Sequence, residues 1–202
     1  MRRLVGAIAL GLAATPALGG CAWLLGHGEL PQPRSPVRPQ DPRLSVTEGT
    51  VAAQCEFLGL GERLATAHNA FGRLSRVVNP YGEDSFVFQV RVENRGQGAI
   101  VVYPAGARLD VGAERPLEPR TLDTYRTRWP AWAVTNEREG EDQGRAYTHI
   151  LQTMLIERQV PAGESTEGRL AFPVAPVRDT FTLTLPYRQA QASRTFTFRW
   201  AL

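Results

Sequence analysis

The chain has 202 residues and a mass of 22.3 kDa, which allows one domain with a sizeable core and short appendages. Hydrophobic residues make up 43% of it and charged residues 21%, an ordinary globular composition. The formal net charge is +3, and Arg2 and Arg3 account for most of it. Because no strongly basic stretch remains beyond them, we expect no nucleic-acid partner.

The first residues are typical of an export leader. Arg2 and Arg3 are followed by an apolar run over residues 4–18, which is too short to span a bilayer comfortably. The run ends in Leu18-Gly19-Gly20-Cys21. This order of residues resembles the lipobox of bacterial lipoproteins, and the resemblance implies that Cys21 is acylated and becomes the first mature residue. The alternative is an ordinary secretory signal in which Cys21 is incidental.

Lipidation implies a protein attached to the lipid bilayer through Cys21 without spanning it, because several acyl chains give stable anchoring. Ala22 follows the cysteine in place of an aspartate. By analogy with lipoprotein sorting, this favours the outer membrane, with the protein facing the periplasm. We therefore expect a signal peptide over residues 1–20.

Prolines recur through the next segment at every second or third position, at Pro31, Pro33, Pro36, Pro39 and Pro42. Proline at this density excludes a helix and disfavours a sheet ladder, so residues 21–43 are predicted to be the lipidated cysteine and a semi-extended linker. The folded domain is predicted to cover residues 44–202.

The domain is predicted to open with a strand or strand pair over residues 44–57. Cys55 lies in it and has no partner for an intrachain disulfide once Cys21 carries lipid. A buried structural thiol is the favoured interpretation, and a reactive or intermolecular thiol is the alternative. Between residues 62 and 78 the apolar residues follow a three-and-four spacing, which predicts an amphipathic helix, or a helix over residues 62–71 followed by an extended stretch.

The central element is predicted over residues 85–103. Phe86, Phe88, Val90 and Val92 alternate with polar residues, which is typical of a half-buried strand. Residues 94–98, with the sequence NRGQG, predict a turn, and residues 100–103 a returning strand. We expect the two strands to pair as a β-hairpin.

A helical insertion is predicted near residues 121–155, where the alternation of apolar and polar residues that is typical of strands stops. Its Trp129 and Trp132 are candidate partner-binding residues, because Trp is enriched at binding hot spots. The alternative is that the pair caps the core. The charged residues 136–142 are predicted to form a loop, and a helix is expected near residues 144–155.

The remaining apolar residues alternate with polar ones over 168–172, 180–187 and 195–200, with a further short strand at 107–111. Short alternating strands separated by turns predict a mainly β fold, an antiparallel β-sandwich. Residues 86–96 (FVFQVRVENRG) and 160–172 (VPAGESTEGRLAF) resemble the immunoglobulin-like domains of exported bacterial lipoproteins. The resemblance implies an immunoglobulin-like sandwich and leaves the activity unassigned.

The sequence has no phosphate-binding glycine loop, no nucleophile elbow and no zinc-protease helix. His68 and His149 could bind a metal together with Cys55 or a carboxylate, and residues 137–142 could attract Ca²⁺, but we favour neither and predict no cofactor and no metal. The leading hypothesis is a non-enzymatic, membrane-anchored module that binds or scaffolds another envelope protein. The alternative is an envelope hydrolase or metal-dependent enzyme whose site forms only on folding.

Overall fold

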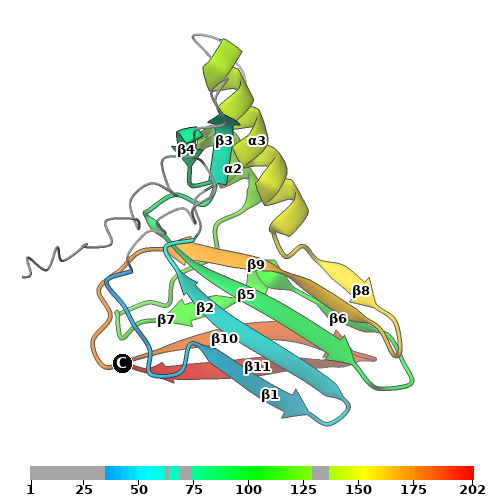
Figure 1. Cartoon of the computed structure of the whole chain (residues 1–202). Coiled ribbons are helices and arrows are strands. Elements are labelled where there is room, and N and C mark those ends of the chain that lie inside the picture. Colours follow the sequence, from blue (N-terminus) through cyan, green and yellow to red (C-terminus); the bar gives the residue numbers. More distant parts are fainter. Residues whose placement is uncertain (1–34, 62–63, 69–73, 129–136) are drawn as a thin grey trace, which may run out of the picture.

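The computed structural model describes residues 35–61, 64–68, 74–128 and 137–202. Two antiparallel sheets face each other (Figure 1). The first has the order β1-β2-β5-β9, formed by β1 (Arg43–Glu48), β2 (Val51–Gly59), β5 (Ser85–Asn94) and β9 (Ser165–Pro173). The second has the order β11-β10-β6-β8, formed by β11 (Ala192–Ala201), β10 (Thr180–Gln189), β6 (Ile100–Val102) and β8 (Arg158–Val160). β7 (Arg108–Asp110) also pairs with β10.

The core lies between the two sheets and is made by the alternating residues that the sequence predicted. Phe88 is fully buried, and its ring centroid lies 5.4 Å from that of Trp200 and 5.8 Å from that of Phe172. Trp200 stacks on Phe181 at 5.0 Å. Aromatic side chains from both sheets therefore fill the space between them, as in a sandwich with aligned sheets.

The predicted hairpin of residues 85–103 is wrong, although both of its strands exist. β5 pairs with β2 and β9, whereas β6 pairs with β10 and β8 in the opposite sheet. Sheets pack about 10 Å apart, and residues 95–99 are long enough to cross that gap. The crossing places successive strands in opposite sheets, as in an immunoglobulin-like sandwich. Alternation predicted which side chains face the core, but it does not determine which strand is the neighbour.

The helix predicted between residues 62 and 78 is also wrong. The described parts of this segment form β3 (Leu64–His68) and β4 (Leu74–Val78), which pair as a separate antiparallel ribbon. Leu64 lies opposite Val78 in the register. The apolar residues of two short antiparallel strands happen to follow one another at intervals of three and four positions, which is also the spacing of an amphipathic helix.

Two helices form the insertion, α2 (Leu122–Arg128) and α3 (Glu137–Thr153). The helix expected near residues 144–155 is confirmed, but it begins at Glu137. Residues 137–142, which were predicted to belong to a charged loop, therefore lie in its first turns. α2, α3, β3 and β4 stand together over one end of the first sheet, opposite the core (Figure 1). No described helix has the length and apolar character needed to cross a membrane.

A second, smaller apolar cluster attaches the insertion to the outer face of the first sheet. Ile150 of α3 and Tyr125 of α2 are fully buried against Val87 of β5 and Ala171 of β9. The fold is thus an immunoglobulin-like antiparallel β-sandwich with a short helical insertion, as the sequence predicted.

The last part of the proline-rich segment packs on the sandwich. Val37 is 6% exposed and belongs to the core cluster. The backbone N–H of Gln40 donates to the carbonyl oxygen of Ala201 at 3.0 Å, and the carbonyl oxygen of Pro42 accepts from the Phe57 N–H at 2.8 Å. The packed domain therefore includes residues that precede Arg43.

Candidate functional site

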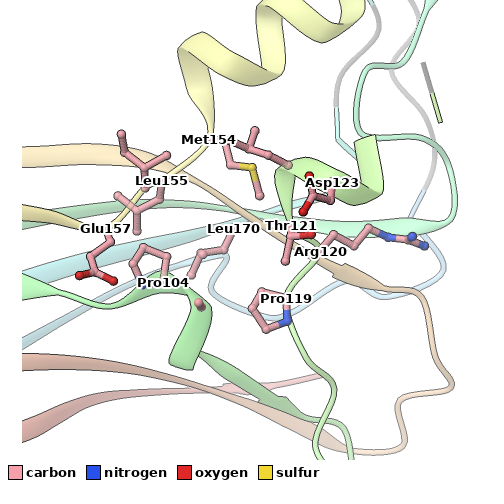
Figure 2. Close-up of a pocket in the computed structure, with 12 residues that line it drawn as sticks. Pro104, Pro119, Arg120, Thr121, Asp123, Met154, Leu155, Glu157 and Leu170 are labelled. Atoms are coloured by element: carbon pink, nitrogen blue, oxygen red, sulfur yellow. The ribbon is translucent and has the colours of Figure 1, made fainter. Parts of the chain in front are cut away.

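A groove lies where the insertion joins the edge of the sandwich, and its volume is about 260 Å³. Pro104 and Ala105 of the short helix η1 (Pro104–Gly106) form one wall. Residues 119–123 and 154–157, which lead into and out of the insertion, form the others, and Leu170 of β9 lies between them (Figure 2). We call this hollow the edge groove.

Two backbone hydrogen bonds create the walls by attaching the insertion to β9. The N–H of Arg120 donates to the carbonyl oxygen of Ala171 at 2.7 Å, and the N–H of Leu155 donates to that of Arg169 at 2.9 Å. Both connections of the insertion therefore run along the outer edge of β9. They cover an edge strand that could otherwise pair with another chain, and they leave the groove between them.

The close approach at Leu155 depends on a glycine. A Cβ at Gly168 would lie 2.6 Å from the Cα of Leu155 and 2.7 Å from its nitrogen. No larger residue fits at this point of β9 without moving the backbone that carries Leu155 and the next wall residue, Ile156.

The floor of the edge groove belongs to the core of the sandwich. Leu155 and Leu170 are 3% and 1% exposed and lie in the main core cluster. Ile156, at the mouth, is 53% exposed and is among the largest exposed apolar side chains of the described residues. A ligand entering the groove would therefore replace water on apolar surface, which favours binding.

Charged side chains lie at both ends of the edge groove. Glu157 lies at one end, and Arg120 leads away from the other (Figure 2). The Nη2 atom of Arg120 donates to Oδ2 of Asp84 at 2.8 Å, and Nη1 of Arg128 donates to Oδ1 of the same carboxylate at 2.7 Å. One carboxylate thus pairs with two guanidinium groups beside the groove, and the exposed carboxylate of Asp123 lines the groove itself.

The pKa of Asp84 reflects this arrangement. Partial burial pushes it upward, but the hydrogen bond from Arg128 and the charges of Arg128 and Arg120 outweigh burial and lower the pKa from its ordinary value of 3.8. Asp84 therefore stays ionised at neutral pH and holds the two arginines together.

Polar groups under the insertion fix α3 to the sheet. The Tyr81 hydroxyl lies 2.8 Å from the Thr153 hydroxyl, which donates to the carbonyl oxygen of His149 at 2.7 Å. Nε2 of His149 lies 3.0 Å from Nη1 of Arg169. A guanidinium only donates hydrogen bonds, so His149 accepts here through an unprotonated Nε2. Deeper in, burial raises the pKa of Tyr125 strongly, against a smaller opposing effect of the Ser85 hydroxyl.

Of the candidate residues predicted from the sequence, only some lie in the described part of the chain. Cys21, Trp129 and Trp132 lie outside the described residues. Cys55 is free and fully buried in the core, and burial, with a smaller effect of Glu56, raises the pKa of its thiol well above the ordinary value. This agrees with a structural thiol.

The metal hypotheses gain no support from the part of the chain that is described. His149 belongs to the cluster with Tyr81 and Arg169, whereas Cys55 lies in the core between the sheets. No three His, Cys, Asp or Glu side chains gather there in a way that could hold a metal ion. Residues 137–142, considered as a Ca²⁺ loop, lie in α3.

The edge groove was not predicted from the sequence. Its walls come from segments that are far apart in the chain, and no spacing connects them. The one local signal is the apolar run Met154-Leu155-Ile156 beyond the end of α3, which is followed by the short strand β8.

Fold and groove together define a class of protein: an immunoglobulin-like β-sandwich with an apolar groove built by an edge insertion. No protein-family model matches the chain, and no curated protein matches it. Among solved structures, it is similar to the yjhA protein of Bacillus subtilis, with 12% identity over 70% of this chain and 76% of that one and a TM-score of 0.36. It is also similar to a candidate lipoprotein of Bacillus subtilis, ycdA, with 16% identity over 79% of this chain and 38% of that one and a TM-score of 0.38.

Proposed function

We propose that this chain is a lipid-anchored protein of the bacterial cell envelope, attached through Cys21, whose sandwich binds another envelope component without enzymatic chemistry. The observation that carries the binding role is the edge groove, in which buried core residues, Leu155 and Leu170, line a hollow beside the exposed Ile156. Apolar hollows with a few polar groups at the rim are the usual form of a binding site.

The anchoring role rests on the order of residues from Arg2 to Cys21. Lipidation would keep the sandwich within reach of the membrane surface, and the proline-rich segment would set its distance from that surface. The absence of Asp at position 22 favours the outer membrane, with the sandwich in the periplasm.

Cys21→Ser tests the anchor. The variant should lose acyl labelling, and the protein should leave the detergent-extracted membrane fraction or stay unprocessed, because serine cannot accept the thioether-linked lipid. Unchanged acyl labelling in this variant would contradict the assignment.

A photo-crosslinking residue at position 156 tests the binding role in intact envelopes. Val174 is a suitable control position because it is also exposed, at 38%, and does not line the edge groove. Crosslinks from position 156 should disappear in Ala105→Trp, which fills the groove from an exposed wall residue. They should persist in Ala162→Trp, where an exposed turn alanine is changed. Equal crosslinking from positions 156 and 174 would contradict the proposal.

Trp129 and Trp132 remain proposed partner contacts. They follow Arg128, the last residue of α2, and the first residues of α2 line the edge groove. Trp132→Ala and Trp129→Ala should each weaken crosslinking from position 156 and leave the melting transition unchanged. A loss of several kcal/mol in stability, which is usual for a buried Trp, would identify the pair as core residues instead.

A further inference from the structure

We propose that Met154 is an oxidation site inside the edge groove, and that methionine sulfoxide at this position loosens the attachment of α3 to β9 and weakens binding in the groove. The chain has two methionines, and the other, Met1, lies in the predicted signal peptide. The modifying reagent is a small oxidant such as hydrogen peroxide. The effect on binding rests on the proposed function, whereas the modification itself does not.

The sulfur of Met154 is open to the groove. Met154 is half-buried and lines the groove, and Figure 2 shows its sulfur pointing into the hollow. The groove has about 260 Å³, and a water molecule occupies about 30 Å³ of liquid. A peroxide molecule, which is little larger than water, can therefore enter and touch the sulfur. Cys55, which carries the other sulfur atom of the described residues, is fully buried in the core and is shielded from the same reagent.

Met154 lies at the point where α3 is joined to the first sheet. Its N–H donates to the carbonyl oxygen of Ile150 at 2.8 Å and completes the last turn of α3. Its backbone forms a parallel bridge with Arg169 of β9, and the next N–H, of Leu155, donates to the Arg169 carbonyl oxygen at 2.9 Å. The Met154 side chain packs on the apolar cluster that contains Ile150. The same residue thus faces the groove and helps to hold the insertion on β9.

Oxidation changes the chemistry of this contact. The sulfur donates an electron pair to one oxygen of hydrogen peroxide, a sulfur–oxygen bond forms, the oxygen–oxygen bond breaks, and water leaves. The thioether becomes a sulfoxide, whose oxygen accepts hydrogen bonds and makes a flexible apolar side chain polar. A polar oxygen is disfavoured on an apolar cluster unless it finds a donor. The oxidised side chain should therefore turn toward water and release the cluster at the end of α3.

Peptide mass mapping of the full-length lipoprotein in nanodiscs tests the modification. After treatment with hydrogen peroxide, the peptide that contains Met154 should gain one oxygen atom while the protein is still folded. Ala105→Trp, which fills the groove from an exposed wall residue, should slow this gain several-fold. Ala162→Trp, at an exposed turn outside the groove, should leave the rate unchanged.

Hydrogen exchange tests the structural effect. In the oxidised protein the amide of Leu155 should exchange about tenfold faster, the change expected for one polar group that loses its hydrogen bonds. Met154→Gln, which places a polar side chain of similar length here, should show the faster exchange without oxidant. Met154→Leu, which keeps the volume and removes the sulfur, should exchange like the wild type and should not respond to peroxide. Methionine sulfoxide reductase with a dithiol should restore the wild-type rate.

Three results would overturn the proposal. The first is that Met154 stays unmodified in the folded protein at a peroxide concentration that oxidises free methionine. The second is that Met154 is oxidised and the exchange of the Leu155 amide is unchanged. The third is that Met154→Leu responds to peroxide as the wild type does, because the effect would then come from another residue.

Crosslinking from position 156 in intact envelopes separates this proposal from the binding function. Peroxide should lower the crosslinks several-fold in the wild type and leave them unchanged in Met154→Leu. If the crosslinks depend on Ala105→Trp but not on oxidation of Met154, the proposal is wrong and the binding function stands. If exchange at Leu155 follows oxidation but the crosslinks do not depend on Ala105→Trp, the oxidation site stands and the binding function is wrong.

Discussion

The side-chain amide of Asn94 donates a hydrogen bond of 3.0 Å to the carbonyl oxygen of Val160, and this bond joins the end of β5 in one sheet to the end of β8 in the other. The same amide nitrogen also lies 2.8 Å from the carbonyl oxygen of Gly98 and 3.0 Å from that of Pro161. Its oxygen accepts from the Gly96 N–H at 3.0 Å. Asn94 is fully buried and closes the turn through which the chain crosses between the sheets.

Asn94→Ala should therefore destabilise the fold by about 2–4 kcal/mol, because it leaves buried carbonyl groups without a donor. Asn94→Asp should cost at least as much, since a carboxylate in this place faces carbonyl oxygens and cannot donate to them. Urea melts at pH 7 measure both losses. Arg95→Ala, at the next, exposed position, is the control and should melt close to the wild type. If Asn94→Ala melted like Arg95→Ala, the crossing would not depend on this side chain.

The resemblance of FVFQVRVENRG to immunoglobulin-like lipoprotein domains predicted a strand that ends in Asn94 and a turn. It did not predict that the Asn94 side chain joins the two sheets. From the sequence, Asn94 could be assigned to a turn because asparagine is frequent there. Two of the carbonyl groups that it satisfies, those of Val160 and Pro161, belong to residues more than 60 positions later, and only the tertiary structure brings them together. For the same physical reason, the alternation in β5 predicted the buried face of the strand correctly and its neighbouring strand wrongly.

The edge groove was harder to predict than the fold. Which side chains of a strand point to the core is encoded locally, here in the alternation of Phe86, Phe88, Val90 and Val92 with polar residues. The groove depends on where Arg120 and Leu155 attach to β9, and those attachments are backbone hydrogen bonds that any residue type can make. Neither leaves a pattern in the sequence.

Phe88→Ala tests the core. The Phe88 ring contacts Phe57, with centroids 5.1 Å apart, as well as Trp200 and Phe172, so its loss should cost about 3–5 kcal/mol. Gln89→Ala is the natural control on the opposite face, where the amide pairs with Glu167 and Arg169 at the surface. It should cost about 1 kcal/mol or less. If urea melts gave equal, small losses of stability for both variants, Phe88 would not face the core as described.

Asp84 should make the stability depend on acid pH. Its pKa in the folded state lies below the ordinary value of 3.8, so the ionised carboxylate stabilises the fold above about pH 4. This contribution is lost as the pH falls through the folded-state pKa. Between pH 7 and pH 3, Asp84→Asn should therefore lose less stability than the wild type in urea melts. The difference should shrink in 1 M NaCl because the Asp84 side chain is 54% exposed. Parallel pH profiles for the two proteins would show that Asp84 is not held by its arginines in solution.

Gly168→Ala tests how the insertion is attached to the sandwich. The new methyl group would lie 2.6 Å from the Cα of Leu155, and both near atoms are backbone, so the chain has to move. The movement should lengthen the hydrogen bond from Leu155 to Arg169 and cost about 1–3 kcal/mol, the usual penalty for overpacking.

Gly144→Ala provides the matched control. Gly144 lies in α3, and an added Cβ would meet nothing within 4 Å, so alanine should stabilise the helix by up to about 1 kcal/mol. Hydrogen exchange provides a second measurement. In Gly168→Ala the amide of Leu155 should exchange faster while the amides of β10 and β11 keep their protection, because those strands pair with each other in the other sheet. If Gly168→Ala were as stable as the wild type and Leu155 kept its protection, the insertion would not be attached at this contact, and the edge groove would not have the wall described for it.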